Sequence, residues 1–244
     1  FNHDITFSGS GELDNGWSVS TTMILVEGAT LSSSNVKLTM GSMGSVRIGS
    51  GTGGTGASFD NVVPTAYEEN HDGMATSTAL DNMGVLLANG QIDYFSPSID
   101  LGGATASFML AWAPEASNTA ITEGGVSTAS VNHGSGHAAG VNISAAGLAL
   151  GAYHASATQD GPLAASSVTG VDGADSNDST WFAKYTAGPV SFGYQKGIID
   201  RGLAAAASTV TTAAKTVAAA GGDFESEAMS IAFNVNENFS VSWS

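Results

Sequence analysis

The feature that most constrains the fold is an alternation of apolar and polar residues that recurs along the whole chain. Between residues 3 and 13, for example, Ile5, Phe7 and Leu13 fall on one side of an extended segment, and Asp4 and Thr6 fall on the other. A side-chain period of two is typical of a β-strand with one apolar and one polar face. About 12 such segments, each of roughly ten residues, follow one another, so the sequence predicts an all-β chain.

The connections between these segments alternate in length. Short turns are expected at 14–16, 43–44, 145–147, 187–188 and 236–238, and every connection between two of them is longer. Strands of about ten residues joined by alternating short turns and long loops are typical of a transmembrane antiparallel up-and-down β-barrel. A soluble β-sandwich with an aromatic core is the alternative, but that fold does not require the alternation of loop lengths.

Aromatic residues lie near both kinds of connection, as two interfacial girdles of a membrane barrel would require. Those next to the short turns are Trp17, Tyr185, Phe239 and Trp243, and those expected nearer the long-loop ends are Tyr94, Trp112 and Tyr153.

Composition excludes several classes of function. The 244 residues carry 22 acidic and 6 basic side chains, a net charge of −16, which disfavours nucleic-acid phosphates as partners. The absence of cysteine excludes disulfides, cysteine-zinc sites and thiol catalysis. No apolar run is long enough for a transmembrane helix. Because no linker or shift in composition divides the chain, we expect a single domain over 1–244.

A long insert, residues 51–90, interrupts this regular pattern where a short hairpin loop would suffice. The insert carries acids at positions 60, 68, 69, 72 and 81 and has no Lys or Arg, whereas the two preceding segments carry Lys37 and Arg47. We expect the insert to fold into the barrel and to face these two cations across a water-filled passage. The alternative is that its acids lie on an outward, solvated loop.

Residues 1–16, 44–49 and 89–98 form three stretches that resemble parts of the general diffusion porins of alphaproteobacteria. Residues 1–16 are similar to a strand and the first periplasmic turn of these porins, and residues 44–49 to the strand that enters their constriction loop. Residues 89–98 are similar to the strand that leaves this loop, where the family has a related Arg-Tyr-Ser-Pro pattern. The order and spacing of the stretches extend the resemblance to the whole chain.

The resemblance implies a homotrimer in the bacterial outer membrane, in contact with its lipid and lipopolysaccharide. Each barrel would have about 16 strands, with the third long loop, here 51–90, folded inward as a constriction. Since this chain supplies about 12, we expect further strands before Phe1 and after Ser244 to complete the barrel. Such a channel lets small hydrophilic solutes and ions diffuse passively, and it is not an enzyme.

Selection in a narrow passage depends on its width and on the charges that line it. Porins of this type set loop acids against wall bases, which makes Lys37 and Arg47 the expected wall cations. The expected loop acids are Asp60, Glu68, Glu69 and Asp72. Because only two bases face these acids, we expect the passage to prefer cations.

A second acidic cluster, Asp172, Asp175 and Asp178, is a candidate calcium site, because calcium prefers oxygen ligands. The cluster does not fit the EF-hand pattern, and a solvated loop is the alternative interpretation. A rival function follows from it: a calcium-binding surface β-protein, such as an adhesin or a layer-forming protein. We expect no other cofactor.

Other patterns do not support a catalytic function. Residues 51–56 fit G-x-G-x-x-G, but no alternation of strands and helices surrounds them, so a sharp bend is the better interpretation. The histidines form no metal-binding motif, and no acid, base and nucleophile come together. The Ala- and Thr-rich stretch 203–220 is expected to contain a short helix.

Overall fold

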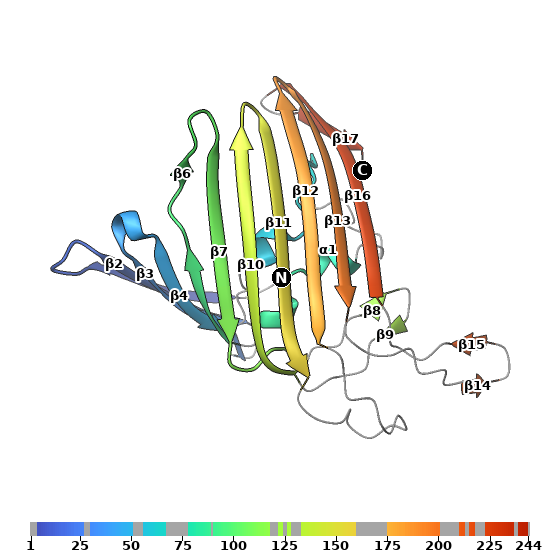
Figure 1. The fold of residues 1–244 in the computed structure, drawn as a ribbon, viewed down its shortest axis with the longest axis horizontal. Coiled ribbons are helices and arrows are strands. Elements are labelled where there is room, and N and C mark those ends of the chain that lie inside the picture. The colour runs from blue at the N-terminus through green and yellow to red at the C-terminus, as the bar shows by residue number, and fades with distance from the viewer. Residues whose placement is uncertain are drawn as a thin grey trace.

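The computed structural model contains one curved antiparallel sheet that runs through most of the chain (Figure 1). It describes residues 4–26, 30–50, 56–66, 78–88, 90–117, 122–123, 126–127, 133–159, 175–200, 210–212, 215–217, 223–236 and 239–243. The strands of this sheet are β1 (Ile5–Glu12), β2 (Ser18–Val26), β3 (Thr30–Thr39), β4 (Ser45–Ser50), β5 (Gln91–Phe95), β6 (Ile99–Asp100), β7 (Thr105–Ala113), β10 (His133–Ala145), β11 (Leu148–Gln159), β12 (Ser176–Ala187), β13 (Val190–Asp200), β16 (Asp223–Asn236) and β17 (Phe239–Trp243).

The strand order confirms the predicted up-and-down topology. Neighbours in the sheet follow the order β1-β2-β3-β4-β5-β7-β10-β11-β12-β13-β16-β17, and the short β6 also pairs with β7. Every pairing is antiparallel. Within the described residues the sheet is open, and β1 and β17 are its two edges.

Two of the short turns show why the sequence turns where it does. Gly16, in the turn between β1 and β2, has φ of 79°. Ala146 and Gly147, between β10 and β11, have φ of 47° and 85°, as a two-residue hairpin turn requires. In Figure 1 the hairpin turns that join β6 to β7, β10 to β11 and β12 to β13 all lie at one end of the sheet.

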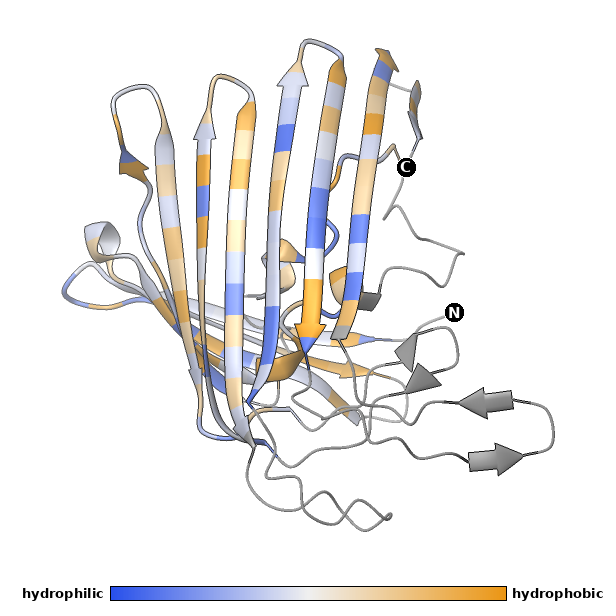
Figure 2. Ribbon diagram, turned by 45° about the vertical axis from the view of Figure 1, so that its right-hand side comes forward, coloured by the Kyte–Doolittle hydropathy of each residue, from blue (hydrophilic) through white to orange (hydrophobic). Residues whose placement is uncertain are grey.

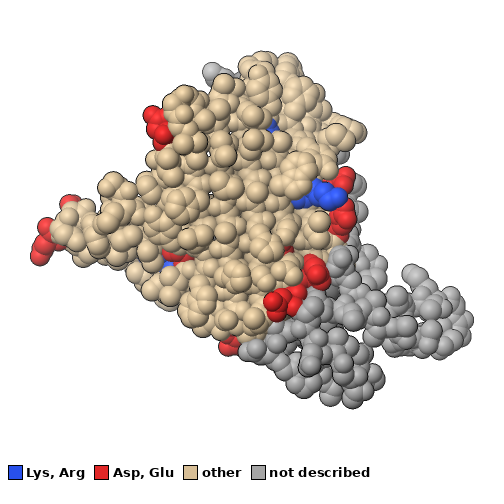
Figure 3. All heavy atoms as spheres, viewed as in Figure 1, with Lys and Arg blue, Asp and Glu red and all other residues tan. Residues whose placement is uncertain are grey.

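Hydrophobic and hydrophilic residues are interleaved along the strands (Figure 2), and many of the large hydrophobic side chains are exposed on the outer face of the sheet, as the alternation predicts. Four residues that would lie in the core of a sandwich are instead well exposed: Phe108 at 37%, Trp112 at 48%, Ile231 at 38% and Phe233 at 40%. In Figure 3 the acidic and basic atoms visible on one face of the molecule lie around its margin. A face of this kind is suited to lipid rather than to a dry core.

The inner face differs from the expectation of a wholly polar, water-lined wall. Met109, Ala111, Ala138, Ala155 and Phe182 are buried on this face. They belong to the same apolar cluster as loop residues, among them Phe59, Leu86 and Leu87. Part of the inner wall is therefore a packing surface for the infolded loop.

The predicted positions of two girdle aromatics, Tyr153 and Tyr94, are wrong. Tyr153 points inward, where it is buried and stacks on Phe59 with ring centroids 5.3 Å apart. Tyr94 faces outward at the level of a short turn, because its hydroxyl donates to the Met43 carbonyl oxygen at 3.0 Å. Met43 belongs to the 3-10 helix η2 (Gly41–Met43), which joins β3 to β4.

The predicted helix within 203–220 is also wrong for the residues described there. These form a two-stranded ribbon of β14 (Val210–Thr212) and β15 (Lys215–Val217). The β-branched residues of this stretch favour extended backbone, and this preference prevails over the surrounding alanines. A second small ribbon consists of β8 (Thr122–Glu123) and β9 (Val126–Ser127). None of the described helices is long and apolar enough to cross a membrane.

Candidate functional site

The candidate site is the inner wall of the sheet together with the described parts of the insert. These parts form the 3-10 helix η3 (Gly56–Phe59), the short helix α1 (Thr78–Asp81) and the 3-10 helix η4 (Val85–Leu87). The insert leaves β4 and returns to β5, but its helices contact β10, β11, β12, β13 and β16. It therefore crosses the concave side of the sheet, as expected of an infolded loop (Figure 1).

Polar side chains of the wall hold the main chain of this loop. Gln195, fully buried on β13, donates from Nε2 to the Phe59 carbonyl oxygen and accepts from the Val62 amide at Oε1, both at 2.7 Å. On β16, Ser230 donates to the Pro64 carbonyl oxygen at 2.7 Å and Ser226 accepts from the Ala79 amide at 3.1 Å. These bonds satisfy backbone groups that burial would otherwise leave unpaired.

The last strand extends this attachment. The Ser242 hydroxyl accepts from the Ala66 amide at 2.9 Å, and the Ser240 hydroxyl donates to the Ala66 carbonyl oxygen at 3.5 Å. The loop therefore reaches from β4 to β17, one of the two edges of the described sheet. We refer to the wall residues Gln195, Ser226, Ser230, Ser240 and Ser242 as the polar clamp.

Glycines of the inner wall leave room for the loop to approach. A Cβ atom at Gly197 would lie 2.5 Å from the Ala79 carbonyl oxygen, and one at Gly140 would lie 2.7 Å from the Phe59 ring. A Cβ atom at Gly193 would overlap Pro64. Any larger residue at these three positions must displace the loop, so the glycines act as its seat.

The wall cations named from the sequence stand side by side. Lys37 and Arg47 are partners in the register of β3 and β4, and both approach the ring of Phe95. The Lys37 ammonium lies 5.6 Å and the Arg47 guanidinium carbon 5.1 Å from the ring centroid, within the range of cation–π attraction.

The sequence interpretation missed the acid that binds Arg47. Asp93 is the register partner of Arg47 on β5, and its Oδ2 lies 2.7 Å from both Nε and Nη2 of that guanidinium. The Asp93 side chain is 0% exposed and that of Arg47 is 18% exposed. The alternation already placed Asp93 on the inward face of β5, so the signal was present but was not used.

A third inward-facing cation, Lys184 on β12, was also missed. Its ammonium lies 5.4 Å from the centroid of the Phe182 ring. Its register partner on β13 is Gly193, one of the seat glycines. Lys184 and Phe182 are two residues apart in the strand and so share a face, and an inward orientation of that face identifies the cation.

The predicted loop acids are only partly within the described chain. Asp60 follows η3 and is half-buried on the infolded loop. Glu68, Glu69 and Asp72 lie outside the described residues. The structure thus places Asp60, Lys37 and Arg47 on the concave side of the sheet.

The two candidate calcium residues that the structure describes, Asp175 and Asp178, differ in solvent exposure. Asp178 lies in β12 with its side chain fully buried, Asp175 is exposed just before that strand, and Asp172 lies outside the described residues. Among the described residues, no group of three or more His, Asp or Glu side chains is arranged to hold a metal ion. The buried His133 forms hydrogen bonds to two other parts of the chain: its ring nitrogens lie 2.6 Å from the Ser117 carbonyl oxygen and 2.7 Å from the Ser176 hydroxyl of β12.

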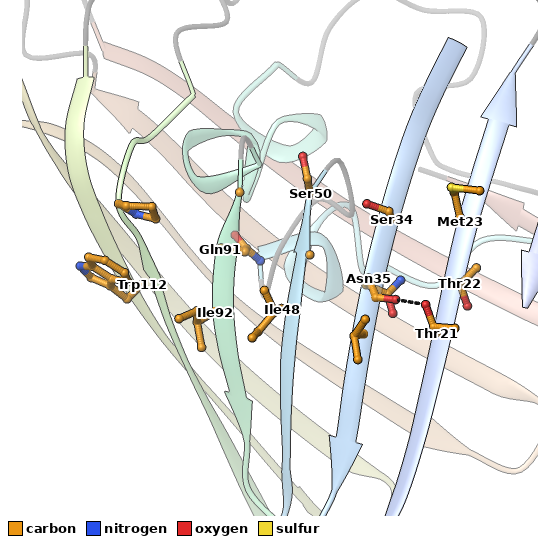
Figure 4. A pocket seen from close by; sticks show the side chains of 14 residues that line it. Thr21, Thr22, Met23, Ser34, Asn35, Ile48, Ser50, Gln91, Ile92 and Trp112 are labelled. Atoms are coloured by element: carbon orange, nitrogen blue, oxygen red, sulfur yellow. Dashed lines mark hydrogen bonds between the residues drawn. The ribbon is translucent and has the colours of Figure 1, made fainter. Parts of the chain in front are cut away.

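The outer face carries two features outside the channel. Lys196 on β13 forms ion pairs with Glu225 and Glu227 on β16, although alternation alone predicts apolar residues there. A hollow lies over β2 to β5 and β7, where Ile48, Ile92 and Trp112 project from neighbouring strands on one side of the sheet (Figure 4). All three are exposed, so this hollow belongs to the apolar outer surface rather than to the passage.

An apolar outer face and a long loop clamped to the inner wall define the class: this is an outer-membrane channel of the β-barrel type. The model of the Gram-negative porin family matches residues 1–239, so the chain belongs to that family. No curated protein matches the chain. The protein is therefore a channel-forming porin of the Gram-negative outer membrane. Its family is one of channels and not of enzymes.

Proposed function

We propose that this porin is a general diffusion channel that small hydrophilic solutes and ions cross passively, with a preference for cations. The observation that supports this proposal is the loop that crosses the concave face and is clamped to the far wall by Gln195 and the serines of β16 and β17. A loop held in that position narrows the passage, and hydrogen bonds alone attach its main chain to these wall residues.

The charge balance supports the preference for cations. The chain carries a net charge of −16, and the described loop contributes Asp60 on the concave side. On the facing wall, Arg47 is already paired with Asp93. An excess of negative potential raises the local concentration of cations and lowers that of anions.

Ion selectivity can be measured directly with the purified protein in planar lipid bilayers. Under a salt gradient, we expect stepwise conductance increments and a reversal potential of the sign that indicates cation preference. Channels with anion preference would contradict the selectivity, and a protein that inserts without conducting would contradict the diffusion function.

The outward apolar face makes a separate prediction about stability. Leu110 on β7 is exposed on this face, and Leu110→Arg should lower the free energy of unfolding in lipid by about 2–4 kcal/mol, the cost of Arg near the bilayer midplane. Leu101→Arg, at the β6–β7 turn, is the matched control and should cost about 0–1 kcal/mol. Urea titration of protein refolded into vesicles measures both, and equal losses would argue against a lipid-facing Leu110.

The finer assignments belong to the same proposal. Membership of the alphaproteobacterial subtype, a homotrimer, contact with lipopolysaccharide and completion of the barrel by further strands follow from the sequence resemblance. The sequence of the surrounding reading frame tests the additional strands, and cross-linking in the membrane tests the trimer. Calcium binding at Asp172, Asp175 and Asp178 stays a prediction, and calorimetric titration without heat at millimolar calcium would contradict it.

A further inference from the structure

We propose that Asp93 sets the ion selectivity of the passage by cancelling the charge of Arg47, so that Lys37 is the cation that permeating ions meet on the part of the wall formed by β3, β4 and β5. The inference rests on the proposed channel function. It differs from the expectation drawn from the sequence, in which Lys37 and Arg47 act together and are balanced by acids of the loop.

Asp93 is held between two neighbouring side chains. Both of its carboxylate oxygens have partners: Oδ2 accepts from Arg47, and Oδ1 accepts from the Gln91 side-chain amide at 2.7 Å. Since the carboxylate is fully buried, solvent does not screen its interaction with Arg47 as it screens an exposed pair. The two opposite charges therefore act at a distance as a nearly neutral pair.

Lys37 lies beside this pair without a carboxylate of its own among the described residues. Its ammonium shares the Phe95 ring with Arg47, yet in the described part of the chain no carboxylate forms an ion pair with it. Two cations on one ring repel each other, and the Asp93 carboxylate offsets that repulsion. Two cations and one carboxylate leave a single net positive charge in the row across β3, β4 and β5, and it resides on the half-buried Lys37.

Permeating ions respond to the net charge of this row of side chains. The inner row across these strands runs from Lys37 through Arg47 and Asp93 to Ala111, so no further charge follows on β7. Removing the Asp93 charge would add a full positive charge to the row. A unit charge within about 8 Å of an ion in water changes the cation-to-anion ratio by roughly two- to fivefold, depending on salt.

The test measures reversal potentials of bilayer channels formed by the full chain. Asp93→Asn should lower the cation-to-anion permeability ratio by about two- to fivefold, and Lys37→Gln should raise it by a similar factor. Asp100→Asn, which removes the same charge at the exposed β6–β7 turn, is the control and should leave the ratio unchanged. Asp93→Asn channels with the wild-type ratio would overturn the inference, whereas wild-type protein that forms no channels would overturn the proposed function instead.

A double variant covers the case in which Asp93→Asn fails to fold, since breaking a buried pair destabilises more than removing both partners. Asp93→Asn with Arg47→Gln deletes the pair as a unit and should keep the wild-type permeability ratio. An increase in cation preference in this double variant would show that ions respond to Arg47 despite Asp93, and the inference would fall.

Discussion

Gln195→Leu channels should conduct more, and with larger fluctuations, than wild-type channels. Leucine fills a similar volume but cannot bond to the Phe59 carbonyl or the Val62 amide, which the glutamine holds at 2.7 Å. Each buried backbone group left without a partner costs about 1–3 kcal/mol, so the loop should be destabilised by roughly 2–6 kcal/mol. Local opening of the loop is the expected outcome, because the strands of the sheet keep their own hydrogen bonds.

Single-channel recording and limited proteolysis of the loop measure this effect. Gln195→Glu should fall between the wild type and Gln195→Leu, because it retains an acceptor for Val62 and loses the donor to Phe59. Thr105→Val is the control, since its hydroxyl bonds to Ser144 on the wall and not to the loop. Gln195→Leu channels with wild-type conductance and protease resistance would show that the loop is held without this side chain.

Gly197→Val should displace α1 from the wall. A Cβ atom at this position would lie 2.5 Å from the Ala79 carbonyl oxygen and 2.9 Å from Leu80 Cδ2. Overpacking of this kind costs about 1–3 kcal/mol. Valine otherwise favours strands, so a loss of stability would identify the contact with the loop as its cause.

Thermal unfolding in detergent and single-channel conductance measure this second effect. Gly11→Val, on β1, is the matched control, because a Cβ atom there would meet nothing within 4 Å. We expect the control to keep the wild-type unfolding temperature and conductance. If Gly197→Val does the same, α1 does not rest on this glycine.

Much of the fold follows from the sequence because the side-chain period of a strand is two. That period predicts strands with one apolar face, and the structure confirms it: the strands form, and Phe108 and Trp112 are exposed on the outer face. Alternation names the two faces but not what covers them. The sequence therefore predicts Tyr153 in an interfacial girdle, whereas in the structure it faces inward and stacks on Phe59 of the loop.

The candidate site was harder to predict because it depends on contacts between distant segments. Lys37 and Arg47 were recognised from their charge, but the pairing of Arg47 with Asp93 joins residues that are far apart in the chain. The sequence does contain one indication of these contacts, in the small residues of the inner wall. Ala111, Ala138 and Ala155 occupy inward positions, where a wall in contact with water would carry polar side chains. Alanine in such a row indicates that another part of the chain packs there.

The polar clamp has a consequence for how such a channel can diversify. Its five side chains bind carbonyl oxygens and amides of the loop, groups that almost every amino acid supplies. Loop side chains that lie outside the apolar cluster can then be exchanged for charged, bulky or aromatic ones while these hydrogen bonds persist. Permeability could then be redesigned through these loop side chains alone, without changing the strands that form the sheet.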